Sequence, residues 1–191
     1  LTPSPLPRHP CSKILDATLA SYHARAGTAC CRALIVADNY KKVVPDDVAP
    51  RWKSGKVHAR HVACYELHKR ALATTCGAPG TPYAAAELIE QGEHRGFANC
   101  VRRGVHAATT PYVLVIQHDR PLARRVDLHA LISSMEEAFR ADGRLTHVGL
   151  PTGNTLYATY VSRMLSKYSL DVEAASVRVG SLRFCPLLQF I

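Results

Sequence analysis

The sequence is poor in acidic residues, in aromatic residues and in long apolar runs. Its 191 residues include 24 Lys and Arg against 15 Asp and Glu, which gives a net charge of +9, and aromatic residues make up 7%. Because no apolar run approaches the roughly 18 residues of a membrane span, the sequence predicts no transmembrane segment. Residues 1–10 also lack the apolar stretch of a signal peptide, which favours a cytoplasmic location. The excess of positive charge favours anionic partners.

Metal-binding cysteine pairs are absent too. None of the seven cysteines forms a Cys-x-x-Cys pair, which argues against a structural zinc site. The spacing of His58, His61 and Cys64 is compatible with one face of a helix. We interpret them as an ordinary helix surface, since short motifs of this kind often match by chance.

What the sequence does contain is the composition of a folded protein. Hydrophobic residues make up 47% and charged residues 20%, and the length predicts a single domain over residues 1–191. The chain begins at Leu1 rather than Met and ends inside the apolar run Pro186–Ile191. We therefore expect a piece of a longer domain, with a first strand missing before Ser12.

Predicted helices and strands alternate along the chain. Such alternation predicts an α/β fold with a mostly parallel central sheet and helices on both faces. We expect a polar loop at 39–57 that contains Trp52, and one or two strands within 172–184. The expected helices are 12–26, 58–75, 96–108, 126–140 and 155–167, and the other expected strands are 33–37, 86–89, 112–116 and 146–150.

The stretch Gly96–Arg120 carries the strongest pattern. Phe97, Val101, Val105 and Ala108 recur at helical spacing and predict one apolar helix face. The apolar run 112–116 that follows is typical of a central parallel strand covered on both faces.

Polar residues follow two of the predicted strands. Gln117, His118 and Asp119 come after 112–116, and Asp38 comes after 33–37. In open α/β sheets, ligands bind beyond the carboxyl ends of the strands, so these residues are candidates for a binding site. For Asp38 and Asp119 an ordinary role in a turn stays open as the alternative.

Basic residues surround this candidate site. Between Val101 and Arg125, Asp119 is the only acidic residue. The bias indicates either a site for an anionic ligand or a solvated basic surface, and both interpretations stay open. The arginines concerned are Arg102, Arg103, Arg120, Arg124 and Arg125.

The order of these motifs resembles the donor-binding half of the GT-A glycosyltransferases, above all family 2. That family has a spaced pair of glycines, an alanine, an apolar strand and then Asp-x-Asp. Here Gly96, Gly104, Ala108, the run 112–116 and the triplet 117–119 follow in that order. Residues 15–22 are similar to the family's first helix and 35–38 to its second strand, so the resemblance covers about residues 12–150.

The resemblance implies a glycosyltransferase that uses a nucleotide-sugar donor. Residues 12–120 would be the donor-binding half, and 121–191 part of the acceptor half. Asp119 matches the aspartate that typically binds Mn²⁺ or Mg²⁺, whereas Gln117 replaces the first aspartate of the motif. The acceptor and the general base stay unidentified. The implied donor-binding residues are Asp38, Arg102, Gln117, His118 and Asp119.

Two other functions stay open. Gln117 and the unidentified base favour a non-catalytic nucleotide-binding relative. The net charge of +9 also fits a basic nucleic-acid-binding protein. We rank that function last and expect no specific nucleic-acid partner, because no recognition motif appears and aromatic residues are few.

Overall fold

The computed structural model describes residues 10–45 and 55–142, and only short pieces between 148 and 184. Trp52, the predicted helix 155–167 and the predicted strand 146–150 lie wholly or largely outside the described residues. The chain divides into two compact units, and each is described by itself. Unit 1 consists of Leu1–Ala20 with Ala29–Asp119, and unit 2 of Ser21–Thr28 with Arg120–Ile191.

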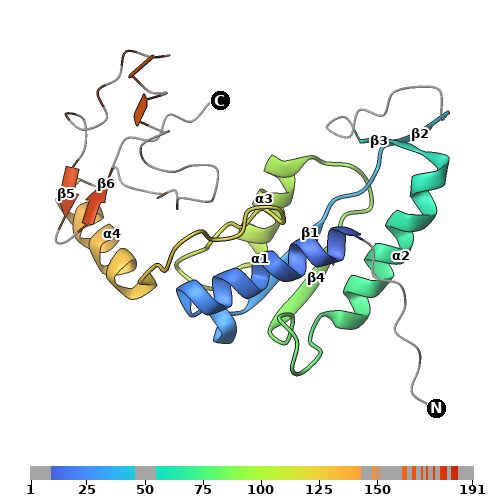
Figure 1. Ribbon diagram of the computed structural model, residues 1–191, viewed down its shortest axis with the longest axis horizontal. Coiled ribbons are helices and arrows are strands. Elements are labelled where there is room, and N and C mark those ends of the chain that lie inside the picture. The colour runs from blue at the N-terminus through green and yellow to red at the C-terminus, as the bar shows by residue number, and fades with distance from the viewer. Residues whose placement is uncertain are drawn as a thin grey trace. The chain divides into compact units, whose positions relative to one another are not determined.

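Unit 1 is built on a pair of parallel strands, β1 (Ala33–Ala37) and β4 (Ala86–Glu90), which lie side by side in Figure 1. Ala33 pairs with Ala86 at one end and Ala37 with Glu90 at the other. The amide of Gln91 extends the ladder by donating to the carbonyl of Ala37 at 2.9 Å. The apolar run 33–37 predicted β1, and the alternation of helices and strands predicted a strand at 86–89; both predictions are confirmed.

Helix α1 (Pro10–Ala26) begins two residues before the expected start at Ser12. Proline is favoured in the first turn, because its fixed φ suits the helix and its missing N–H has no partner there anyway. The helix ends where expected, at Gly27, which adopts φ +67° and donates its amide to the carbonyl of His23 at 3.2 Å. A single turn of 3₁₀ helix, η1 (Thr28–Cys30), follows.

Helix α2 (Ala59–Thr75) covers the strand pair of unit 1 together with the first part of α1. Leu19 of α1, Leu72 of α2, Tyr83 and Ala86 are buried against one another and form the core of the unit. Leu67 of the same helix lies outside this core and is 57% exposed. Leu67 lies five residues from Leu72, which places it on a different face of the helix.

Two short strands replace much of the loop predicted over residues 39–57. β2 (Lys42–Val44) pairs in parallel with β3 (Lys56–His58), and Val44 and Val57 are both buried. The loop was predicted from the turn-forming residues Pro45, Pro50 and Gly55. The prediction was wrong because two very short apolar segments form strands all the same. Glycine and proline mark turns, but they do not exclude strands of three residues on either side of them.

Helix α3 (Phe97–Ala107) packs on β1 through a different face from the one predicted. Phe97 and Val105 are 56% and 47% exposed, whereas Cys100 is buried. At Gly104 an added Cβ would lie 3.4 Å from Cγ2 of Val36. Cys100 and Gly104 are small residues one turn apart, so the helix approaches the strand closely along their line rather than along the larger apolar residues.

The predicted central strand 112–116 is not a strand in the structure. Tyr112, Val113, Leu114 and Val115 belong to no sheet and are between 39% and 50% exposed. In the part of the chain that the structure describes, β1 and β4 pair only with each other, and residues 112–116 pair with no strand. A parallel strand needs a neighbour for its backbone groups, and an apolar sequence cannot supply one.

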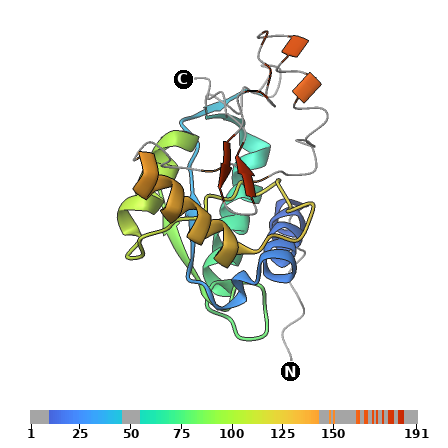
Figure 2. The same ribbon diagram turned by 90° about the vertical axis from the view of Figure 1, so that its left-hand side faces the viewer.

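Unit 2 contains the end of α1, helix α4 (Leu128–Asp142) and an antiparallel pair, β5 (Val177–Val179) and β6 (Leu182–Phe184), which is dark red in Figure 2. The predictions of this helix and of strands within 172–184 are confirmed. Ser21 and Arg25 lie one turn apart on α1 and hold residues 122–126 against it. The amide of Leu122 donates to Oγ of Ser21 at 2.8 Å, and the amide of Val126 donates to the carbonyl of Arg25 at 2.8 Å.

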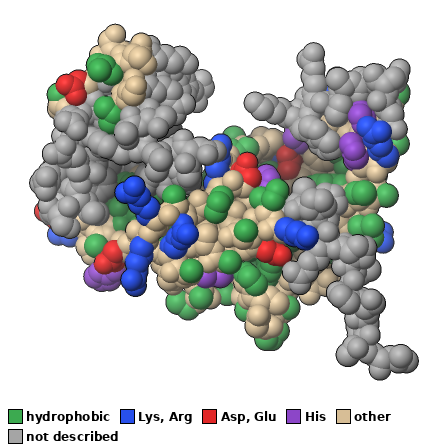
Figure 3. All heavy atoms as spheres, viewed as in Figure 1, with side chains coloured by type: hydrophobic (Ala, Val, Ile, Leu, Met, Phe, Trp, Pro, Cys, Tyr) green, Lys and Arg blue, Asp and Glu red, His purple; other side chains and the backbone are tan. Residues whose placement is uncertain are grey.

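The fold is thus α/β, with small parallel sheets and helices packed on them, as the alternation of elements predicted. Hydrophobic side chains (green) reach the surface on the face shown in Figure 3. Among the described residues, no helix combines the length and the hydropathy that crossing a bilayer requires.

Candidate functional site

Asp38 follows the last residue of β1, at the carboxyl end of the parallel pair. Its carboxylate accepts hydrogen bonds from the backbone amides of Arg95 at 2.7 Å and Gly96 at 2.9 Å. Gly96 is the N-cap residue of α3 and Arg95 precedes it, so the amide of Gly96 has no partner within the helix. Asp38 therefore caps α3 from another element, and its negative charge is favourable at this end of the helix dipole.

His94 lies against the same carboxylate. Its Nδ1 is 2.8 Å from Oδ2 of Asp38 and 3.0 Å from the carbonyl oxygen of Asn39. Both neighbours are acceptors, so Nδ1 carries the proton. The imidazole also packs on Gly55, where an added Cβ would lie 2.5 Å from Cγ of His94. Gly55 adopts φ +69°, a conformation that glycine accepts without strain.

Tyr65 of α2 and Cys100 of α3 complete the surroundings of Asp38. The hydroxyl of Tyr65 donates to the backbone carbonyl of Asp38, and the thiol of Cys100 donates to its carboxylate. Burial, followed by the nearby charge of Asp38, raises the pKa of Tyr65 to about 12. The same two causes, in the same order, raise the pKa of Cys100. Both side chains therefore stay protonated at neutral pH and act as hydrogen-bond donors.

The triplet Gln117, His118 and Asp119 occupies a turn, and all three side chains are exposed. The backbone carbonyl of His118 accepts a hydrogen bond of 2.8 Å from Oγ1 of Thr18, a residue of α1 that is 0% exposed. The turn is thus fixed by its backbone, which leaves the three side chains facing solvent. None of them is among the residues that contact Asp38.

Arg102 lies apart from the other predicted donor-binding residues. It lines a surface groove of about 460 Å³ along α3. None of Asp38, Gln117, His118 and Asp119 lines this groove. The other lining residues are Glu90, Gln91, Arg95, Asn99, Arg103 and His106.

The predicted metal site rests on Asp119. Within the described ranges, no group of three or more His, Cys, Asp or Glu side chains is arranged to hold a metal ion. Magnesium is often bound by one or two carboxylates together with substrate phosphates. The exposed carboxylate of Asp119 fits that pattern when the phosphates of a ligand supply the remaining oxygens.

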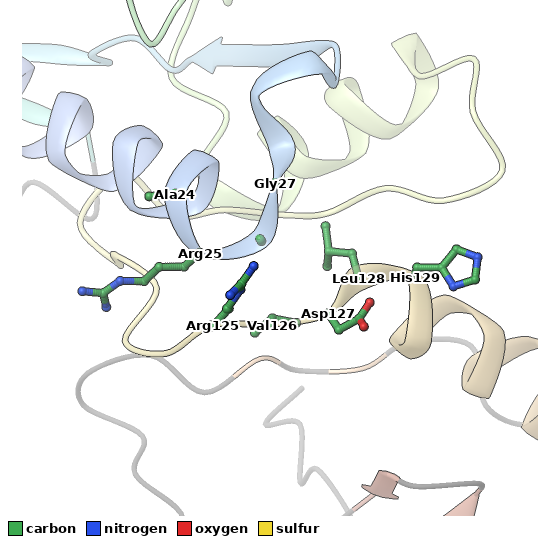
Figure 4. A pocket seen from close by; sticks show the side chains of 9 residues that line it. Ala24, Arg25, Gly27, Arg125, Val126, Asp127, Leu128 and His129 are labelled. Atoms are coloured by element: carbon green, nitrogen blue, oxygen red, sulfur yellow. The ribbon is translucent and has the colours of Figure 1, made fainter.

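Unit 2 has a cavity of its own, of about 750 Å³, between the end of α1 and the start of α4 (Figure 4). It is lined by residues 24–27 and 125–129. Asp127 is already used there, since its Oδ1 accepts from the amide of Ala130 at 3.0 Å. The guanidinium of Arg25 donates to the carbonyls of Leu122 and Ala123 at 2.5 Å each. Two of the charged groups in the lining therefore hold the local structure together.

The sequence did not single out His94, Tyr65 or Cys100 as neighbours of Asp38, nor Gly55 as a neighbour of His94. They come from three separate segments, and only His94 has a nearby signal, its position two residues before Gly96. The groove residues carry a clearer signal. Positions 95, 99, 102, 103 and 106 recur at helical spacing, so they lie on one face of a helix.

Comparison with family models, with curated proteins and with solved structures found no match to this chain.

Proposed function

We propose that the protein is a GT-A-like glycosyltransferase that binds a nucleotide-sugar donor beyond the carboxyl ends of its parallel strands. One observation carries the proposal: Asp38 follows β1 and caps α3, so a strand end, a helix N-terminus and an acidic residue meet at one place. Crevices at strand ends are where open α/β sheets bind nucleotides.

Four of the five predicted donor-binding residues have a role in this proposal, and Arg102 lies outside the donor site. Asp38 and His94 form the wall that faces the nucleoside part of the donor. Gln117 and His118 contact the donor from the turn 117–119, and Asp119 holds a divalent cation together with the diphosphate. The cation, when bound, would stabilise the negative charge that develops as the diphosphate leaves.

A non-catalytic nucleotide-binding relative is the second candidate. Its support is that the carboxylate of Asp38 already has four partners: the amides of Arg95 and Gly96, the imidazole of His94 and the thiol of Cys100. A carboxylate with this many hydrogen-bond partners holds the surrounding residues in place, but it has little acceptor capacity left to bind a ligand. Gln117 also removes one of the two carboxylates of the family's metal motif.

Calorimetric titration with UDP-sugars and GDP-sugars, with and without manganese, tests the proposal. It is run on the wild type, on Asp119→Ala and on the control Glu137→Ala, which removes an exposed carboxylate of α4. We expect manganese-dependent binding that Asp119→Ala abolishes and Glu137→Ala retains.

The other outcomes decide between the candidates. Binding that needs no manganese and survives Asp119→Ala would favour the non-catalytic relative. A folded protein that binds none of the nucleotide sugars contradicts both.

A further inference from the structure

The groove along α3 is the second concentration of polar side chains in unit 1. Arg95, Asn99, Arg102, Arg103 and His106 line it from the helix and the residues just before it. They recur every three or four residues, so they share the face of α3 that is turned away from β1. The face toward β1 is the one that carries Cys100 and Gly104.

Two arginines of the groove carry positive charge that no carboxylate of the described residues neutralises. Arg102 and Arg103 are exposed, and among the described residues no carboxylate lies within ion-pair distance of either guanidinium. Arg95, by contrast, is paired with Glu93 at 2.5 Å. Two adjacent arginines offer the planar, bidentate hydrogen bonds that suit a phosphate group.

The groove also contains acceptor groups, among them a carboxylate. Glu90 follows the ladder of β4, and its carboxylate is partly engaged, 3.7 Å from Nζ of Lys69. The side-chain amide of Asn99 donates to the carbonyl of Arg95 at 2.8 Å, which leaves its oxygen as an acceptor. Acceptors of this kind bind hydroxyl groups and repel phosphates.

We propose that the α3 groove binds a phosphorylated polyol, such as a sugar phosphate or a nucleotide. Its phosphate lies on Arg102 and Arg103, and its hydroxyl groups donate to Glu90 and Asn99. The groove's volume of about 460 Å³ is enough to hold a ligand of that size. A phosphodiester chain fits it less well, because Glu90 would face the next phosphate along the strand.

This proposal is independent of the donor site at Asp38 and Asp119. It assigns Arg102 to a second site, since the groove contains none of the other predicted donor-binding residues. A failure to bind nucleotide sugars at the strand ends would therefore leave it unaffected.

Calorimetric titration with ribose 5-phosphate, ribose and inorganic phosphate tests the inference. We expect ribose 5-phosphate to bind the wild type about tenfold more tightly than phosphate, and ribose to give no signal. The double variant Arg102→Ala/Arg103→Ala should lose at least about tenfold in affinity for ribose 5-phosphate.

Two single variants test the role of the carboxylate in the groove and provide a control outside it. Glu90→Gln should bind phosphate as the wild type does but lose part of the preference for ribose 5-phosphate. Arg70→Ala removes an exposed arginine of α2 outside the groove and should change nothing. Circular dichroism spectra that match the wild type show that each variant is folded.

Four results would overturn the inference. Equal affinity for phosphate and ribose 5-phosphate would make the groove a simple anion patch. If the double variant bound ribose 5-phosphate as tightly as the wild type does, the ligand would lie elsewhere. If the wild type did not bind ribose 5-phosphate, the groove would not be a site for this class of ligand. A single-stranded oligonucleotide that displaces ribose 5-phosphate, with a steep dependence on salt, would make the groove a nucleic-acid surface.

Discussion

Nδ1 of His94 lies 2.8 Å from Oδ2 of Asp38, and the same imidazole packs on Gly55. This contact links the end of β1, the loop before β3 and the start of α3 around one carboxylate. The segments are far apart in the sequence, so the arrangement depends on the parallel pairing of β1 and β4. The following predictions test the parts of this arrangement and the core beneath it.

Removing the carboxylate of Asp38 should destabilise the protein. Asp38→Ala takes the acceptor from the backbone amides of Arg95 and Gly96 just before α3, and losing such bonds at a helix start costs about 0.5–2 kcal/mol. Asp38→Asn keeps one acceptor oxygen and should cost about half as much. Urea unfolding followed by circular dichroism measures the difference. Equal stability of all three proteins would show that the cap contributes nothing.

Gly55 should tolerate alanine less well than Gly77. Both glycines have positive φ, +69° and +77°, so both substitutions incur the backbone cost of about 1 kcal/mol. Only at Gly55 would the new Cβ meet the imidazole of His94, at 2.5 Å, whereas at Gly77 nothing lies within 4 Å.

We therefore expect Gly55→Ala to lower the free energy of unfolding by about 1–3 kcal/mol more than Gly77→Ala does. Thermal unfolding of the two variants gives the comparison. Identical losses would mean that the contact between Gly55 and His94 imposes no constraint.

Leu72 should be far more sensitive to truncation than Leu67, although both belong to α2. Leu72 is 5% exposed within the core, so Leu72→Ala should cost about 2–5 kcal/mol, the usual range for a cavity left by a buried leucine. Leu67 is 57% exposed, and Leu67→Ala should change the stability by about 0.5 kcal/mol or less. Chemical denaturation checks both, and a larger loss for Leu67→Ala would contradict the packing of α2.

Tyr65 should make the protein sensitive to alkaline pH. Its pKa is about 12 in the folded state, raised from 10.0 mainly by burial. Below pH 10 both states keep the proton and the contribution to stability is complete. As the pH rises from about 10 to 12, the unfolded chain releases its proton first, so the free energy of unfolding falls.

Tyr65→Phe removes this titration and should reduce the alkaline fall. At neutral pH the same variant should lose about 1 kcal/mol, because the hydrogen bond to the carbonyl of Asp38 disappears. Urea unfolding at about pH 9, 10.5 and 12 follows the effect. Tyr112→Phe, which alters a partly exposed side chain, serves as the control. An alkaline fall as steep in Tyr65→Phe as in the wild type would refute the assignment.

Local patterns predicted most of the helices and strands, but not which faces they bury. The helix 96–108 was predicted from Phe97, Val101 and Val105, yet it packs along Cys100 and Gly104. The hydrophobic pattern identifies an apolar side, whereas the line of contact depends on which side chains are small enough for the helix to approach its strand.

The predicted donor-binding residues show the same contrast between what a local pattern predicts and what packing decides. The sequence placed Asp38 and the turn 117–119 after apolar runs, and the structure keeps those positions along the chain. It does not pair 112–116 with a neighbouring strand, and it places Arg102 in a groove with Arg103 and His106. Strand pairing depends on residues distant in the sequence, so the pattern within one run cannot predict it.

Residue spacing and composition are enough to predict the α/β class, the positions of α2, α3 and α4, and the basic character of the α3 surface, because these features act locally. Three features appear only in the folded chain: Asp38 binds the backbone at the start of α3, His94 packs on Gly55, and 112–116 is exposed. Those features depend on contacts between segments, and the close packing that selects them is a property of the folded chain.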